Sequence, residues 1–179
     1  MRILHLTEKD YKVGQWSGGT TTELFIWPEG ADYAKREFSV RVSSARVGLE
    51  ESDFTPLVGV MRYITPLSGG FTLTHPGITP VVMLPMDVPY RFSGETPTHC
   101  VGKATDFNLM LKGVAGEMAL CDQVWRLRPG FNCLYAVADT AVALENGYTL
   151  RPGELLVVFA EQSCAANISA KAIACYAEV

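Results

Sequence analysis

Turn-forming residues recur at short intervals along the whole chain and divide it into short β-like segments. Clusters containing Gly or Pro occur at residues 17–19, 28–30, 68–70, 75–77, 93–95, 128–130, 145–147 and 151–153. The runs between these clusters are rich in Val, Ile, Phe, Tyr and Thr. Many short strands bounded by such turns are typical of a sandwich or barrel. The sequence therefore predicts an all-β fold.

Two segments show the strand period directly. Residues 38–45 and 71–74 alternate apolar and polar side chains, which predicts strands with one buried face. A competing helical interpretation exists for the Ala-rich segments 139–145 and 165–172. The Val, Thr and Ile residues that interrupt the alanines favour strands there as well.

Charge and hydropathy exclude several classes of protein. The 179 residues carry a formal charge of −4 without long charged runs, unlike the basic surface of a nucleic-acid-binding protein. The first ten residues contain recurring charges and lack the apolar core of a secretory signal. The longest apolar run, residues 155–160, is far shorter than the ~18 residues typical of a membrane-spanning helix. We expect a soluble cytoplasmic protein that contacts neither nucleic acid nor membrane.

The five cysteines form no closely spaced pair. Cys100, Cys121, Cys133, Cys164 and Cys175 lie at least eleven positions apart, so a local zinc knuckle or redox pair is not available. The odd number also differs from a secreted disulfide framework. We expect five reduced thiols.

The chain divides near residues 113–125, where two glycines lie between strand-like blocks. The later block repeats a strand, Gly turn, strand rhythm that is also present in residues 64–92, which suggests two unequal copies of one β unit. We expect one barrel in residues 1–113 and a second in residues 114–179, packed as a compact unit, with an exchange of strands between them left open.

Four blocks of sequence resemble the HutD/Ves family. They are Trp16-Ser-Gly-Gly-Thr-Thr-Thr-Glu-Leu-Phe, Phe38-Ser-Val-Arg-Val-Ser, Phe54-Thr-Pro-Leu-Val-Gly-Val-Met-Arg and Asp106-Phe-Asn. The resemblance covers residues 11–113, and the remainder matches only in its cupin-like rhythm. It implies a bicupin, that is, two cupin or jelly-roll barrels in one chain. It also implies a bacterial protein without established catalytic activity, associated in some members with histidine utilisation and with a small acidic metabolite such as N-formylglutamate or urocanate.

The histidines differ from the pattern of metal-dependent cupins. Those proteins hold a metal with a His-x-His pair, a nearby Glu and a third His on a later strand. Here His5, His75 and His99 are the only histidines, and no two lie within twenty positions. A His-rich metal site cannot be assembled locally from them, so we expect no metal and no other cofactor.

Four charged residues in the family-like blocks are candidate ligand-binding residues. Arg41 shares a strand face with Ser43, and Arg62 lies among apolar neighbours, where a buried arginine needs a partner. Glu23 and Asp106 are the natural counterions. If all four pair internally, the set is structural and a ligand is held by hydrogen bonds from Thr21, Ser43 and Asn108. If one arginine stays unpaired, the barrel interior prefers a carboxylate.

The remaining candidates come from the first block and from the motif around Asp106. The predicted ligand-binding set is Trp16, Gly19, Thr21, Glu23, Arg41, Ser43, Arg62, Asp106 and Asn108. Trp16 is equally compatible with a core position, and Gly19 permits either a tight turn or a close approach of the backbone to a ligand.

No catalytic residue is predicted. The chain has no GxSxG motif, no Cys/His grouping and no phosphate-binding glycine loop. His75 is compatible with a base in a metal-independent cupin enzyme, or with a satisfied core histidine. We favour a non-enzymatic, small-molecule-binding bicupin that acts as a regulator or sensor in amino-acid catabolism. A metal-independent isomerase or epimerase, or a protein-interaction module with a homodimer interface, are the alternatives.

Overall fold

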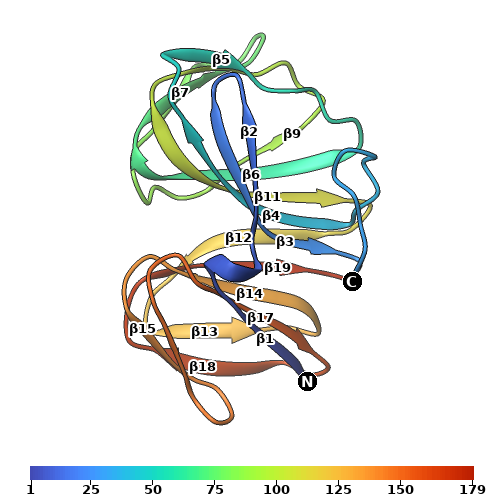
Figure 1. Ribbon diagram of the computed structural model, residues 1–179, viewed down its shortest axis with the longest axis vertical. Helices are drawn as coiled ribbons and strands as arrows, with labels where there is room; N and C mark the ends of the chain where they lie inside the picture. The colour runs from blue at the N-terminus through green and yellow to red at the C-terminus, as the bar shows by residue number, and fades with distance from the viewer. The chain divides into compact units, whose positions relative to one another are not determined.

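The computed structural model describes residues 1–179, which fold into nineteen strands and one short 3₁₀ helix, η1 (Glu8–Asp10). The predicted all-β fold is confirmed. The strands form two compact units, each built from a larger and a smaller antiparallel sheet (Figure 1). We call Lys12–Gly113 the N-terminal barrel and Met1–Tyr11 together with Val114–Val179 the C-terminal barrel. No helix of the structure is long and apolar enough to cross a membrane.

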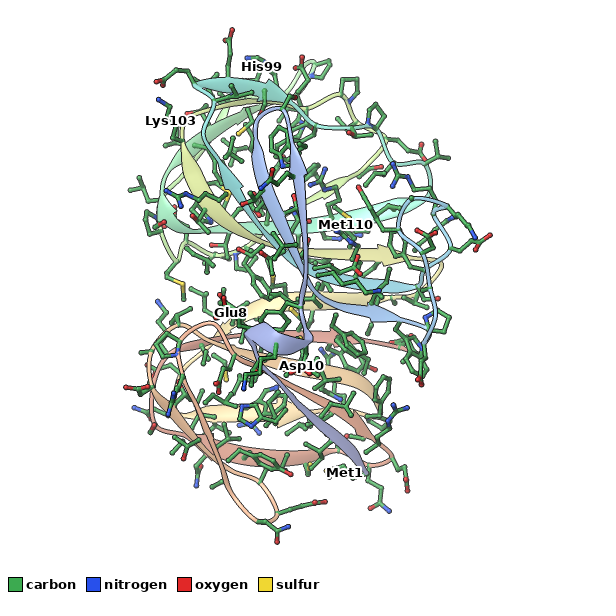
Figure 2. The ribbon with its side chains drawn as sticks, viewed as in Figure 1. Met1, Glu8, Asp10, His99, Lys103 and Met110 are labelled. Atoms are coloured by element: carbon green, nitrogen blue, oxygen red, sulfur yellow. The ribbon has the colours of Figure 1, made fainter.

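The N-terminal barrel contains ten strands. Its six-stranded sheet has the order β2 (Lys12–Trp16), β3 (Gly19–Trp27), β4 (Val40–Val47), β11 (Ala104–Lys112), β6 (Val60–Gly69) and β9 (Tyr90–Ser93). Its four-stranded sheet has the order β5 (Glu51–Asp53), β10 (His99–Val101), β7 (Phe71–Thr74) and β8 (Val81–Met83). Side chains from these strands project into the interior of the barrel (Figure 2).

The C-terminal barrel contains nine strands. Its five-stranded sheet has the order β1 (Arg2–Leu6), β17 (Leu155–Ala160), β14 (Gly130–Ala136), β19 (Ala172–Ala177) and β12 (Gly116–Cys121). Its four-stranded sheet has the order β13 (Val124–Leu127), β18 (Cys164–Ile168), β15 (Thr140–Ala143) and β16 (Tyr148–Leu150). The Ala-rich segments thus contain strands β15 and β18, as the interrupting β-branched residues indicate.

The first strand lies in a different barrel from the one expected. The sequence places residues 1–11 in the first barrel, with an exchange of strands left open, whereas β1 pairs along its whole length with β17, from Arg2 opposite Phe159 to Leu6 opposite Leu155. Tyr11 adds a link within the same unit, since its hydroxyl donates hydrogen bonds to the carbonyls of Leu6 and Gly153 at 3.1 and 2.9 Å. This pairing joins residues about 150 positions apart, and nothing local in the sequence specifies it.

The interior of the C-terminal barrel is apolar. Its buried cluster comprises Cys121, Trp125, Leu127, Leu134, Ala136, Val142, Leu144, Leu150, Leu156, Val158, Ala160, Ala166, Ile168 and Ala172. Because alternate residues of a strand point to the same face, β14 contributes Leu134 and Ala136 to this cluster and β17 contributes Leu156, Val158 and Ala160. Burial of this apolar surface stabilises the C-terminal barrel.

Candidate functional site

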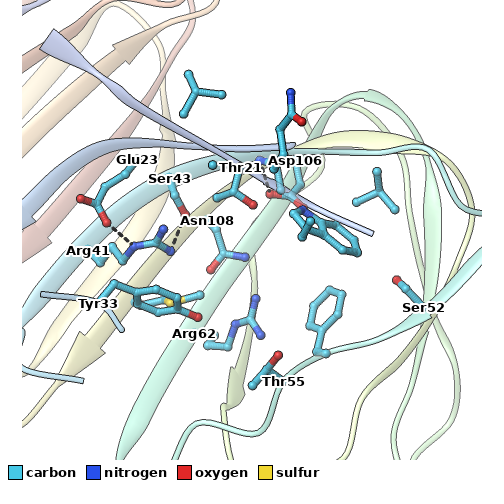
Figure 3. Close-up of a pocket in the computed structure, with 18 of the residues that line it drawn as sticks. Thr21, Glu23, Tyr33, Arg41, Ser43, Ser52, Thr55, Arg62, Asp106 and Asn108 are labelled. Carbon is cyan, nitrogen blue, oxygen red and sulfur yellow. Dashed lines mark hydrogen bonds and ion pairs between the residues drawn. The ribbon is translucent and has the colours of Figure 1, made fainter. Parts of the chain in front are cut away.

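A cavity of about 590 Å³ opens inside the N-terminal barrel (Figure 3). All of its walls come from this one unit. The lining residues are Lys12, Val13, Gly14, Gln15, Trp16, Thr21, Glu23, Tyr33, Arg41, Ser43, Ala45, Val47, Ser52, Asp53, Phe54, Thr55, Arg62, Asp106, Asn108 and Met110. The volume lies within the ~300–1,000 Å³ range of typical small-molecule sites.

The alternation of strands β4 and β11 places polar side chains in the cavity. On β4, Arg41 and Ser43 line it, whereas the intervening Val42 is fully buried on the opposite face. On β11, Asp106 and Asn108 line the cavity, with Phe107 fully buried between them. The two strands pair with Asn108 opposite Ser43 and Asp106 opposite Ala45, so both polar rows belong to one continuous wall.

Arg41 is fully engaged by neighbours from its own barrel. Its Nε donates to Glu23 Oε2 at 2.8 Å and its Nη1 donates to Ser43 Oγ at 3.3 Å. The guanidinium also lies over the Tyr33 ring, with its carbon 3.8 Å from the ring centroid. Since both partners of the ion pair are largely buried, this pair is a structural element of the wall.

Arg62 is also buried, with 7% of its surface exposed, but it has no carboxylate within ion-pair distance. Its Nε has no hydrogen-bond partner, and its guanidinium carbon lies 4.5 Å from the centroid of Phe54 and 5.3 Å from that of Phe92. Burial lowers the pKa of Arg62 to about 10, against the opposing attraction of Asp106. Arg62 therefore remains a cation at neutral pH and is held mainly by aromatic rings.

Asp106 and Asn108 carry polar atoms that the barrel leaves poorly satisfied. The Ala45 amide donates to Asp106 Oδ1 at a long 3.3 Å. Burial raises the pKa of the Asp106 carboxyl to about 7, and the Arg62 charge and the Ala45 hydrogen bond oppose that shift only in part. Asn108 Oδ1 is buried without a partner. Together with Arg62 Nε, these atoms are the hydrogen-bonding groups that a polar ligand can satisfy.

Eight of the nine predicted site residues line this cavity: Trp16, Thr21, Glu23, Arg41, Ser43, Arg62, Asp106 and Asn108. Gly19 is not among the lining residues. A Cβ atom at Gly19 would lie 1.9 Å from the Arg46 carbonyl oxygen, and its φ of 155° is one that other residues rarely adopt. The absence of a side chain at Gly19 is thus explained by the close approach of strands β3 and β4.

His75 lies outside the cavity wall and is buried among aromatic rings. Its ring is 5.7 Å from that of Tyr90 and 5.3 Å from that of Phe92, and Nδ1 lies 3.1 Å from Thr98 Oγ1. Its burial matches a core position, but Nε2 is buried without a hydrogen-bond partner, so the ring is only partly satisfied. No group of three His, Cys, Asp or Glu side chains in residues 1–179 is arranged to hold a metal ion.

Several residues of the wall, chiefly the aromatic residues Tyr33 and Phe54, are not among those predicted from the sequence. Phe54 belongs to one of the family-like blocks, so the sequence offered a signal for it. Tyr33 lies between β3 and β4, in a segment without a periodic pattern. The alternation of β11 was sufficient to predict Met110, since it follows Asp106 and Asn108 on the same face of this strand.

A family model described as HutD matches residues 8–176. The chain belongs to the HutD family. Its fold is similar to that of HutD from Pseudomonas fluorescens SBW25, with a TM-score of 0.84 and 24% sequence identity over 98% of each chain. A conserved protein of unknown function from Pseudomonas aeruginosa PAO1, PA5104, gives a TM-score of 0.83 at 24% identity, covering 99% of this chain and 98% of the other.

More distant structures show how widely the HutD architecture is shared. The Ylba protein of Escherichia coli has a TM-score of 0.68 at 10% identity, covering 98% of this chain and 90% of that one. At such identities the likeness concerns the fold alone, which is that of two cupin-like barrels in one chain. A comparison with curated proteins found no match.

Proposed function

We propose that this HutD-family protein binds a small carboxylate in the N-terminal barrel and acts as a non-enzymatic sensor or regulator in amino-acid catabolism. The observation that carries the proposal is the state of Arg62. Of the two arginines in the cavity, Arg41 is neutralised by Glu23, whereas Arg62 is buried without an ion-pair partner. An unpaired arginine is the condition under which the sequence predicts a carboxylate ligand.

The energetics of burial support this choice of ligand. A buried cation without a counterion has lost hydration that aromatic rings restore only in part. A ligand carboxylate supplies charge-assisted hydrogen bonds, each worth ~1.5–3 kcal/mol. Asn108 Oδ1 needs a donor, so a ligand that carries an N–H or O–H beside its carboxylate fits both groups.

The family association suggests which carboxylates to try first. Some HutD-family members are associated with histidine utilisation, whose acidic intermediates include urocanate and N-formylglutamate. Both combine a carboxylate with an N–H group and are small relative to a cavity of about 590 Å³. We therefore propose a ligand of this type for a protein that acts in the cytoplasm.

The test is a ligand panel measured in two ways. Isothermal titration calorimetry with urocanate, N-formyl-L-glutamate and the uncharged amide of urocanate should show saturable binding of the acids and none of the amide. Incubation of each ligand with the protein, followed by chromatography, should return it unchanged. Turnover would favour the metal-independent enzyme, and the absence of binding by either acid would favour an interaction module.

A matched variant locates the binding. Arg91 is an exposed arginine of β9, a strand that pairs with β6 in the same barrel. Arg91→Met should bind the acids as the wild type does, whereas Arg62→Met should not. Equal loss in both variants would point to a general effect of net charge and against the cavity.

A further inference from the structure

Asp106 is an acidic group in a site proposed to bind an acid. It lines the same cavity as Arg62, and only 5% of its surface is exposed. Along β11 the cavity-facing positions run Asp106, Asn108, Met110, and Arg62 lies opposite Met110. Asn108 therefore occupies the wall position between Asp106 and Arg62, as Figure 3 shows. A carboxylate drawn to Arg62 enters the space that Asp106 also faces.

The other charged and titratable groups in and around the cavity do little to neutralise Asp106. From β4, Arg41 is paired with Glu23 of β3. Lys12 of β2 and Asp53 of β5 line the cavity from exposed positions, where water screens them. From β10, the buried thiol of Cys100 has a pKa raised to about 11 by burial and by Asp106, so it stays neutral. Arg62 is the attraction that remains, and burial outweighs it.

A second carboxylate near Arg62 changes this balance further. Two carboxylates that share one site cannot both ionise without a large cost, so the buried one keeps a proton. A protonated Asp106 is then an O–H donor aimed at the cavity instead of a repelling charge. We propose that Asp106 binds the ligand in its protonated form, donating its O–H to the carboxylate that Arg62 attracts, so that binding above neutral pH takes up one proton from solvent.

This inference rests on the proposed function and gives it a specific pH dependence. Below about pH 7 Asp106 already carries the proton, and the affinity is nearly constant. Above that value the free protein must first protonate Asp106, and the affinity falls by about tenfold per pH unit while the bound form stays protonated. Asp106 thereby determines which protonation state of the site accepts an anion.

Acetate is the cleanest probe, because its carboxyl group stays ionised throughout the neutral range and it has no second titrating group. Its dissociation constant should be measured by NMR titration between about pH 6 and pH 9 for the wild type and for Asp106→Asn. We expect the wild type to weaken about tenfold per unit above pH 7.5, and Asp106→Asn, which keeps a donor and an acceptor for Ala45, to bind with a nearly constant affinity.

Two controls keep the test decisive. His99→Gln removes an exposed histidine whose pKa is raised by its hydrogen bond to Asp53, and this variant should keep the wild-type slope. Calorimetry of the wild type in two buffers of different ionisation enthalpy should give close to one proton taken up per acetate near pH 8, independently of how the variant folds. Binding without proton uptake would overturn this inference alone, whereas no acetate binding at any pH would overturn the proposed function as well.

Discussion

The two barrels are built alike and filled differently. In the C-terminal barrel the inward side chains form one apolar cluster that includes Trp125 and Leu156. In the N-terminal barrel, successive inward positions of β6 are Val60, Arg62 and Ile64, so a cation interrupts the apolar row. The apolar residues on either side belong to two different clusters of this barrel. The same scaffold thus serves as a packed core in one unit and as a polar cavity in the other.

A buried asparagine in each barrel shows the same contrast. In the C-terminal barrel, Asn132 Oδ1 accepts from the Arg128 amide at 2.9 Å, and its Nδ2 donates to the carbonyls of Arg128 and Gly130 at 2.7 and 3.1 Å. In the N-terminal barrel, Asn108 Oδ1 has no partner. One asparagine stabilises a turn, and the other leaves a hydrogen-bonding site open to a ligand.

The largest expected effect comes from emptying the packed barrel. Trp125 is 1% exposed within the apolar cluster, so Trp125→Ala should lower the free energy of unfolding by ~3–5 kcal/mol in urea titrations. Trp16→Ala is the matched change in the N-terminal barrel. Trp16 is 41% exposed beside the cavity, so this substitution should lower the free energy of unfolding much less. Similar losses in the two variants would contradict the distinction between a filled and a hollow barrel.

The next effect separates structural charge from binding charge within the hollow barrel. Arg41→Ala leaves Glu23 as a largely buried carboxylate without its partner, and stability should fall by ~1–3 kcal/mol. The double variant Glu23→Ala/Arg41→Ala should recover part of this loss, which a double-mutant cycle in urea measures. Strictly additive losses would show that the pair contributes nothing to the cavity wall.

Arg62→Met should change binding more than stability. Because Arg62 has no ion-pair partner, replacing it breaks no ion pair. Met also retains much of the packing against Phe54 and Phe92. We expect an unchanged or higher melting temperature together with tenfold or more weaker carboxylate binding, equivalent to ~1.5–3 kcal/mol. A large fall in melting temperature with unchanged affinity would reassign Arg62 to the structural role that Arg41 has.

Local sequence patterns were sufficient for much of the fold and of the site. The period of two in residues 38–45 predicted that Arg41 and Ser43 share a face, and the structure turns that face into the cavity. Turn residues and β-branched side chains predicted the strand content, including strands in the Ala-rich segments. These properties depend on neighbours a few residues apart, which is why the sequence displays them.

The same local patterns could not predict which residues far apart in the sequence pair with one another. The sequence left open which arginine pairs with which carboxylate, because Glu23 meets Arg41 only through the register of β3 and β4. The pairing of β1 with β17 is a contact of the same kind, joining the two ends of the chain. Gly19 illustrates a third limit, since a glycine required by a close backbone approach looks the same in sequence as one that faces a ligand.

The smallest expected effect concerns the thiols, four of which belong to the packed barrel. Cys121, Cys133 and Cys175 are buried there, whereas Cys164 is partly exposed. Burial raises the pKa of Cys175 well above its usual value, and Cys133 lies directly opposite it on the neighbouring strand. Since a thiolate is the reactive form, these buried thiols should react slowly even though two of them are adjacent.

A thiol titration measures this protection. The native protein should release one equivalent of chromophore rapidly, from Cys164, and five after denaturation, while added reductant should leave the melting temperature unchanged. Cys164→Ser is the control, because it should abolish the rapid phase alone. A stoichiometric bridge between Cys133 and Cys175 would contradict the expectation of five free thiols. Rapid reaction of all the thiols in the native state would instead show that the C-terminal barrel opens readily, and the contrast between a packed and a hollow barrel would no longer hold in solution.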